Sequence, residues 1–315
     1  MFYPEVKSTI REDISILLKL DNHPWNYICE CGDASNLTVR EVQNTNAIFI
    51  SHTHIDHFIN FDTIIRHQIG IQRRVTICGP KNIAKQVQAR IKSYTWNLIK
   101  KGAIIYEIRE VLSNQEIKIY ELEPPVWELK EIRTIKDSII FKEKHFTVNY
   151  TILDHKTPSI AYKFKENDLV KIDLKESDFK GGTWVKELKN AFKNQMDDQI
   201  ITVEDKKVKA KELFHLLHLK KGDTIGIIMD HLACKQNHDK IRSHFFMCRK
   251  VFIECFYKNE DRQQAEINFH SYADMSGKIM QETEVKEAIP VHFSRKYNEY
   301  EINELILEFE SALKK

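Results

Sequence analysis

The sequence predicts an α/β fold in which two β-sheets pack face to face and helices cover their outer surfaces. Short apolar runs of strand length recur in both halves of the chain, and stretches with a helical spacing of apolar residues alternate with them. Hydrophobic residues make up 42% and aromatic residues 10% of the 315 residues. Such a composition is typical of a globular protein with a core of its own.

The N-terminal third is predicted to consist of strands joined by turns, with one helix at its end. Two strand-like runs flank Asp-Asn-His-Pro at 21–24, which indicates a hairpin. Two later runs are continuously apolar, as expected of strands buried on both faces. The spacing of Ile83, Val87 and Ile91 predicts a helix. The expected strands are 14–20, 25–29, 47–51 and 75–78, and the expected helix is 81–95.

The middle of the chain divides into two stretches of different character. Residues 103–165 look rich in strands. Residues 166–215 are charged and lysine-rich, contain the only Gly-Gly pair and lack a sustained core period. We therefore predict a single domain spanning 1–315, from which 166–215 projects as an arm.

Strands and helices alternate again from residue 224 to the C-terminus. This alternation in the second half, after the strands of the first, is the basis for placing helices outside two packed sheets. The expected strands are 224–229, 251–256 and 288–293, and the expected helices are 237–248, 271–280 and 299–313.

The charge balance and the N-terminus exclude some classes of protein. Lys and Arg number 48 and Asp and Glu number 46, so the net charge of +2 argues against a surface that grips nucleic acid everywhere, although a local basic patch stays open. The N-terminus lacks the basic and apolar segments of a secretory signal. No apolar stretch approaches the roughly 18–20 residues that cross a bilayer. We expect a cytoplasmic protein that does not bind membranes.

The six cysteines are scattered and include no Cys-x-x-Cys pair. Several lie in apolar strand-like runs, so we interpret them as buried thiols and not as zinc-ribbon ligands. The pair in Cys29-Glu30-Cys31 receives the same interpretation. The cysteines are Cys29, Cys31, Cys78, Cys234, Cys248 and Cys255.

The run Ser51-His52-Thr53-His54-Ile55-Asp56-His57 follows directly on a predicted buried strand. Three histidines and an aspartate at the mouth of a strand are too polar for the core. Imidazole and carboxylate are the ligands that zinc takes in catalytic sites. Alternation along an extended segment places His52 and His54 on one side and Asp56 with His57 toward another. The segment can therefore serve two adjacent metal ions.

This motif resembles that of the metallo-β-lactamase superfamily, and later segments resemble its tRNase Z (ribonuclease Z) branch in the same order. Residues 225–230 resemble the strand that ends in a metal-bridging aspartate, with His231 in place of the usual threonine. Residues 291–297 resemble His-Phe-Ser-x-Arg-Tyr, with Lys296 where arginine is usual. Other matching segments are 29–33, 152–164, 251–256, 269–271 and the arm stretch 181–189. The branch opens with a Gly-Thr-containing loop, whereas residues 1–11 contain no glycine.

The resemblance implies a four-layer αββα sandwich and a two-metal site. It implies that one metal is bound by three histidines, that the other is bound by an aspartate and two histidines, and that a further aspartate bridges them. The implied ligands are His52, His54 and His155 for one metal, Asp56, His57 and His292 for the other, and Asp230 between them. The cofactor is expected to be two Zn²⁺, although such sites also accept Mn²⁺ or Fe. His155 also fits an ordinary strand-end histidine, and Asp230 a helix N-cap.

The implied activity is endonucleolytic removal of 3′ extensions from tRNA precursors, by attack of a metal-bridging hydroxide. His270 would protonate the leaving 3′ oxygen, oriented by Glu254, and Asp56 is counted with them as catalytic. Glu254 lies in the apolar run 251–256, where an unpaired carboxylate is costly, so it needs a partner such as His270. Histidines that belong to no matched motif, such as His231, are expected to be structural or solvated.

Substrate contacts and alternatives are less constrained by the sequence. Ser294 and Lys296 of the last motif, and Lys186 and Lys189 of the arm, are candidate contacts to the substrate. Acidic residues lie among the arm lysines, so a solvated surface is an equal interpretation. Two alternatives stay open: a phosphodiesterase whose substrate is a small phosphodiester such as a cyclic nucleotide, and a non-catalytic subunit that binds RNA or a partner. The resemblance also implies a homodimer.

Overall fold

The computed structural model describes residues 1–175 and 179–314, so residues 176–178 of the predicted arm lie outside the description. The chain forms two compact units. The first comprises Met1–Lys165 and Thr224–Lys315, and the second comprises Glu166–Asp223.

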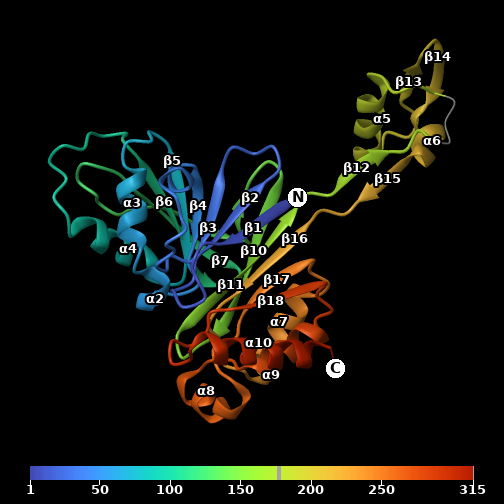
Figure 1. The fold of residues 1–315 in the computed structure, drawn as a ribbon. Helices are drawn as coiled ribbons and strands as arrows, with labels where there is room; N and C mark the ends of the chain where they lie inside the picture. The colour runs from blue at the N-terminus through green and yellow to red at the C-terminus, as the bar shows by residue number, and fades with distance from the viewer. Residues whose placement is uncertain (176–178, 315) are drawn as a thin grey trace. The chain divides into compact units, whose positions relative to one another are not determined.

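The first unit contains an eight-stranded sheet whose strands follow one another in sequence order (Figure 1). Its strands are β1 (Phe2–Val6), β2 (Ile16–Leu20), β3 (Asn26–Cys29), β4 (Thr45–Phe49), β5 (Arg74–Gly79), β6 (Ile105–Ser113), β7 (Glu116–Leu122) and β8 (Lys130–Lys136). The predicted hairpin is formed by β2 and β3, which pair antiparallel. Strand β4 lies between β3 and β5 and is parallel to both, which explains its unbroken apolar sequence.

The second sheet of this unit has six strands in the order β18-β17-β16-β11-β10-β9. These strands are β9 (Ile139–Lys142), β10 (Phe146–Asp154), β11 (Pro158–Glu166), β16 (Thr224–Ile228), β17 (Lys250–Glu254) and β18 (Glu287–Val291). Strands β16, β17 and β18 run parallel to one another. Their carboxyl ends therefore meet at one edge of the sheet.

Three hydrophobic clusters separate four layers. Phe49 of the first sheet packs edge-to-face on Tyr162 and Phe164 of the second, at ring-centroid distances of 5.3 and 4.9 Å, in the cluster between the sheets. On β4, Ile48 points the other way, into a cluster under the helices α3 (Phe61–Gln68) and α4 (Ile83–Lys92). A third cluster joins the outer face of the second sheet to α7 (Lys235–Phe245), α9 (Ala273–Glu282) and α10 (Glu299–Leu313). The predicted four-layer αββα sandwich is confirmed.

The helices of the first unit are short except for α10, whose N-terminus has a capping box formed by Asn298 and Glu301. Its bounds equal the predicted 299–313. The sequence prediction missed β1 and the small helices near the histidine motif. The helices are α1 (Val39–Gln43), α2 (Ile55–Phe58), α3 (Phe61–Gln68), α4 (Ile83–Lys92), α7 (Lys235–Phe245), η2 (Asn259–Asp261), α8 (Arg262–Asn268), α9 (Ala273–Glu282) and α10 (Glu299–Leu313). Five of the six cysteines are buried, as predicted.

The second unit has a core of its own, which the sequence interpretation of 166–215 missed. Helix α5 buries Trp184, Leu188 and Ala191 on one face, a helical period that the surrounding lysines obscure. These side chains pack on Ile201 and Val203. Its elements are β12 (Leu169–Ile172), α5 (Trp184–Lys193), β13 (Ile200–Val203), β14 (Lys206–Lys209), α6 (Ala210–Leu213), η1 (Phe214–Leu216) and β15 (Leu217–Lys220). In the described residues, no helix has both the length and the apolar composition of a membrane span.

Candidate metal centre

The ligand-type side chains lie at the carboxyl ends of four strands of the first unit. The histidine motif follows β4, His155 follows β10, Asp230 follows β16 and His292 follows β18. Strands from both sheets thus deliver polar groups to one end of the sandwich. The loop after β4 is held by a hydrogen bond from the Gln86 amide to the Thr53 hydroxyl (2.8 Å).

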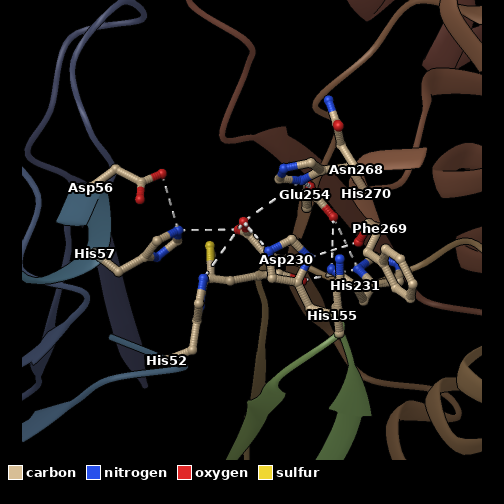
Figure 2. A network of polar contacts seen from close by, with 12 residues as sticks. His52, Asp56, His57, His155, Asp230, His231, Glu254, Asn268, Phe269 and His270 are labelled. Atoms are coloured by element: carbon tan, nitrogen blue, oxygen red, sulfur yellow. Dashed lines mark hydrogen bonds and ion pairs between the residues drawn. The ribbon is translucent and has the colours of Figure 1, made fainter. Parts of the chain in front are cut away.

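These side chains form two groups that share one aspartate. Figure 2 shows His52 and His57 turned toward this residue, Asp230. Within each group, one candidate ligand atom per residue lies within 4.8 Å of all the others. The first group is His52, His54, His155 and Asp230, and the second is Asp56, His57, Asp230 and His292. The structure therefore brings together all seven residues that the sequence singled out, in the predicted partition.

The two carboxylate oxygens of Asp230 face different groups. Oδ2 lies 3.4 Å from His155 Nε2 and 3.8 Å from His52 Nε2. Oδ1 lies 3.1 Å from both His57 Nε2 and His292 Nδ1. Asp56 belongs to the second side, because its Oδ2 is 3.3 Å from His292 Nε2. A carboxylate in this position has the geometry of a bridge between two cations.

The donor atoms that point inward make no hydrogen bond within the described part of the chain. They are His52 Nε2, His57 Nε2, His292 Nδ1 and Asp230 Oδ1, all of which are buried. An unsatisfied buried polar atom typically costs about 1–3 kcal/mol, so such atoms rarely gather without a ligand. Imidazole nitrogens and carboxylates are the donor set of a transition-metal site. The arrangement fits a metal cofactor.

The outward-facing nitrogens of three of these histidines are each engaged, which fixes the orientation of the rings. His155 Nδ1 donates to the carbonyl of Phe269 (2.6 Å), and His52 Nδ1 lies 3.0 Å from the Ser51 hydroxyl. His57 Nδ1 lies 3.0 Å from Glu30 Oε2. These contacts leave Nε2 of each ring facing Asp230.

Glu30 contacts the candidate metal ligand His57, and the sequence analysis assigned it no role. Its side chain is completely buried and accepts hydrogen bonds from the backbone N–H and the hydroxyl of Ser51 as well as from His57. Burial raises the pKa of Glu30, whereas Asp230 and Glu30 together outweigh burial at His57 and raise the pKa of that ring. The available signal was a carboxylate between two cysteines at the end of the apolar run of β3, similar to the signal that drew attention to Glu254.

A third group joins Asp230 to Glu254 and His270. Glu254 Oε1 accepts a hydrogen bond from His270 Nδ1, and Phe256 stacks on the His270 ring at 3.9 Å with an interplanar angle of 5°. Burial opposes the charge on Glu254, but His270 outweighs it and lowers the pKa to about 2. Burial likewise opposes the charge on His270, and Glu254 overcomes it and raises the pKa. Each partner therefore favours the charged form of the other, an imidazolium beside a carboxylate.

His231, which sequence analysis left as structural or solvated, is structural and buried. Its Nδ1 donates to the carbonyl of Met229 (2.9 Å) and lies 3.3 Å from Glu254 Oε2. The backbone N–H groups of His231 and Ser271 also donate to that oxygen, at 3.0 and 3.3 Å. Oε2 is thus the anchored end of Glu254, and Oε1 is the end that meets His270.

The four candidate substrate contacts lie in two settings. Ser294 is buried just after His292, and its hydroxyl accepts from the Lys296 N–H (3.4 Å). The Lys296 ammonium pairs with Asp261 (2.8 Å) and lies 5.0 Å from the Tyr297 ring centroid. Lys186 and Lys189 belong to α5 of the second unit, where Lys186 is exposed and Lys189 is half-buried.

A pocket opens beside the first ligand group. It is lined by His54, His155, Lys156, Thr157, Ile267, Asn268, Phe269 and His270. His270 and two of the ligand-type histidines thus border the same cavity. A substrate in this pocket would lie next to both the metal centre and the Glu254–His270 pair.

Comparison of the sequence with known proteins supports the resemblance. No family model matches the chain. The chain is 23% identical over 290 residues to a protein named Ribonuclease Z from Deinococcus radiodurans, with coverage of 89% of this chain and 85% of that protein. It is 28% identical over 297 residues to the Ribonuclease Z of Borreliella burgdorferi, covering 90% and 80%.

Solved structures agree on the fold. The human tRNase Z short form superposes with a TM-score of 0.56 at 15% identity, covering 93% of this chain and 90% of that one. The metallo-β-lactamase fold protein YhfI from Bacillus subtilis superposes with a TM-score of 0.57 at 10% identity, covering 99% and 93%. The chain has the metallo-β-lactamase fold, and its sequence relatives are ribonuclease Z proteins. The resemblance predicted from the histidine motif is therefore confirmed.

Proposed function

We propose that this protein is a metal-dependent endoribonuclease of the tRNase Z type, which removes 3′ extensions from tRNA precursors and carries two zinc ions per chain. The observation that supports it most directly is Asp230, whose two oxygens face two separate groups of ligand-type side chains. Relatives named Ribonuclease Z that match about nine-tenths of the chain support the choice of substrate.

The seven residues of the two groups would hold the metals. Bound there, two metal ions would activate a water molecule at neutral pH and offset the charge that develops on the phosphoryl oxygens. His52, His54 and His155 would form one side, Asp56, His57 and His292 the other, and Asp230 would bridge. Glu30, Ser51 and the Phe269 carbonyl would keep the imidazole rings in the orientation that binding requires.

His270 would serve as the general acid of the reaction. Its Nδ1 is held by Glu254 and its ring is clamped against Phe256, so Nε2 is the nitrogen left to give a proton to the departing 3′ oxygen. Glu254 raises the pKa of His270 and so favours the protonated ring that a general acid needs. Such assistance typically contributes about 10²–10⁴-fold to the rate.

Further features of the proposal concern the substrate and the assembly. Ser294 and Lys296 would contact the RNA near the cleavage site, and Lys186 and Lys189 of the second unit would contact phosphates of the tRNA body. The unit Glu166–Asp223 would thus act as the tRNA-binding arm of a single hydrolase domain. We further propose a cytoplasmic homodimer, on the strength of the family resemblance.

The experiment is to incubate zinc-loaded protein with a 3′-extended tRNA precursor and, in parallel, with a small chromogenic phosphodiester. We expect cleavage of the precursor at a single position, its loss in His54→Ala, and its loss and recovery when zinc is removed and restored. Turnover of the small diester with an uncut precursor would replace the tRNA substrate by a small phosphodiester. Cleavage of neither, with two metals bound, would refute phosphodiesterase function altogether.

A further inference from the structure

Two residues beside the metal centre adopt a backbone conformation that L-amino acids with large side chains avoid. Phe269 has φ +61° and Lys156 has φ +60°, both in the left-handed region. For a bulky residue this conformation is an outlier, and such strain concentrates at functional sites. Phe269 occupies the position after the last turn of α8, where glycine or asparagine is the usual residue.

The two strained residues border the same pocket. Both line the cavity next to His155 and His270, and the Lys156 ammonium lies 5.8 Å from the centroid of the Phe269 ring. Figure 2 shows Phe269 beside His155 and His270. Ile267, another lining residue, is 70% exposed, so the pocket has an apolar edge next to a cationic one.

Neither core packing nor metal-ligand support explains the Phe269 side chain. The ring is half-buried and belongs to none of the hydrophobic clusters formed by the described residues. The backbone carbonyl of Phe269 does hold His155, but glycine offers the same carbonyl and adopts positive φ without strain. The presence of an aromatic side chain at position 269 is therefore left unexplained by packing or by the contact to His155.

We propose that Phe269 is a stacking platform for a nucleobase of the substrate, and that the base belongs to the nucleotide on the 5′ side of the scissile bond. His270, the next residue, would protonate the oxygen that leaves, and that oxygen is the 3′ oxygen of this nucleotide. The base attached to the same ribose then falls in the pocket that Phe269 and His270 share. Lys156 flanks the ring and supplies a cation for the neighbouring phosphate. This inference rests on the proposed function for its choice of nucleotide.

Equilibrium binding of small ligands to zinc-loaded protein tests the platform without requiring cleavage. The probes are adenosine 3′-monophosphate and its base-free counterpart, methyl riboside 3-phosphate, with inorganic phosphate as the reference for the metal centre. Stacking of one base on an aromatic side chain typically changes affinity by about 5- to 150-fold. We expect wild-type protein to prefer the adenosine compound by such a factor.

Phe269→Gly is the informative variant, because glycine keeps the backbone conformation and the carbonyl that holds His155. We expect unchanged zinc content, unchanged phosphate affinity and loss of the preference for the base. Phe269→Tyr should retain the preference. The matched control is Phe246→Ser, which removes another phenylalanine, 49% exposed, from the same unit and should alter nothing.

Two results would overturn the platform: equal affinity of wild-type protein for the two riboside phosphates, or a preference that survives in Phe269→Gly. Loss of zinc from Phe269→Gly would also overturn it, since the ring would then support the metal site. Cleavage of tRNA precursors is measured in a separate assay, so that a failure of the proposed function can be told from a failure of the platform. A base preference that depends on Phe269 in a protein that leaves precursors uncut would keep the platform and reject the tRNA substrate.

Discussion

Two buried glutamates of this molecule each contact Nδ1 of a histidine, and the two histidines lie in different surroundings. Glu30 and Glu254 are both inaccessible to solvent. Glu30 meets His57, whose ring is completely buried and turns Nε2 toward Asp230 at 3.1 Å. Glu254 meets His270, whose side chain is 13% exposed and borders the pocket. The same pair of residue types thus serves a candidate metal ligand in one place and a candidate proton donor in the other.

The difference lies in what faces the second ring nitrogen. At His57 it is a carboxylate oxygen within a ligand group, so the imidazole is placed to give an electron pair to a cation. At His270 it is open space lined by a lysine and an aromatic ring, so the imidazole is placed to give a proton to a bound molecule. A carboxylate–histidine pair therefore acquires its function from the surroundings of the far nitrogen, and each pair predicts a different consequence of mutation.

Removal of the proton donor gives the largest expected change in rate. His270→Ala should lower kcat for tRNA precursor cleavage by about 10²–10⁴-fold, the usual contribution of general acid catalysis, while the protein keeps its metals. Single-turnover kinetics and metal analysis of the same preparation check this. His244→Ala, a half-buried histidine outside the site, serves as control and should retain wild-type kcat. Metal loss from His270→Ala would contradict the distinction between the two pairs.

Removal of the Glu30 charge, which lies behind the candidate ligand His57, should lower metal affinity and not the rate of proton transfer. Glu30→Gln keeps the size of the side chain but removes the carboxylate that contacts His57, and second-sphere changes of this kind typically cost about 10–100-fold in metal affinity. Titration against a competing chelator measures it, and kcat should recover at saturating zinc. Glu41→Gln is the matched control, since Glu41 pairs with Lys7 and Lys19 away from the site. Unchanged zinc affinity in Glu30→Gln would remove Glu30 from the metal centre.

Much of this arrangement could be predicted from the sequence because it depends on strand ends. The histidine motif follows a continuously apolar strand of the first sheet. Asp230 and His292 follow β16 and β18 of the second sheet, which run parallel on either side of β17, so their carboxyl ends meet at one edge. The partition of His52 and His54 from Asp56 and His57 was predicted from alternation along an extended segment, and that reason was wrong. Residues Ile55–Phe58 form the helix α2, so a helical turn places Asp56 and His57. The closing helix was predicted at 299–313 from the alternation of strands and helices, and these are its bounds in the structure.

Other features depend on contacts between residues far apart in the sequence. Glu30 is separated from His57 by 27 positions and contacts it only because β3 and β4 are neighbours. The positive φ of Phe269 is set by the end of α8 and leaves no mark on a sequence that carries phenylalanine there. In the second unit, the helical period of α5 was hidden because lysines surround Trp184 and Leu188. None of these features can be predicted from the pattern of neighbouring residues in the sequence.

The charge of Glu254 should control the pH range in which His270 works. Because the pKa of His270 is raised, the ring stays protonated to a higher pH than an ordinary histidine does. Activity that needs this proton should fall as the pH rises through the raised pKa. In Glu254→Gln the attraction is gone and the alkaline limb should move to lower pH. A displacement of one unit lowers the rate at the alkaline end roughly tenfold. A kcat–pH profile measures it at saturating metal, and an alkaline limb that stays in place would separate Glu254 from the proton donor.

The smallest expected effect concerns His231, which contacts the anchored oxygen of Glu254. Replacing it with leucine removes the Nδ1 donor that lies 3.3 Å from Oε2 and 2.9 Å from the Met229 carbonyl. Loss of one such hydrogen bond typically corresponds to about 2- to 12-fold. Since Glu254 acts through His270, the loss should appear only where the leaving group needs a proton. Cleavage of tRNA precursors should therefore slow in His231→Leu, whereas a diester with a nitrophenol leaving group should react at the wild-type rate.

His231→Asn separates this positioning role from a general need for the ring. The asparagine amide offers an N–H close to the position of Nδ1, so it should restore most of the precursor cleavage that leucine loses. A variant that merely loosens the core would slow both substrates alike, because the metal centre and the Glu254–His270 pair would suffer together. Equal losses on both substrates in His231→Leu would thus assign His231 to packing, and the anchoring of Glu254 to the backbone N–H groups of His231 and Ser271 alone.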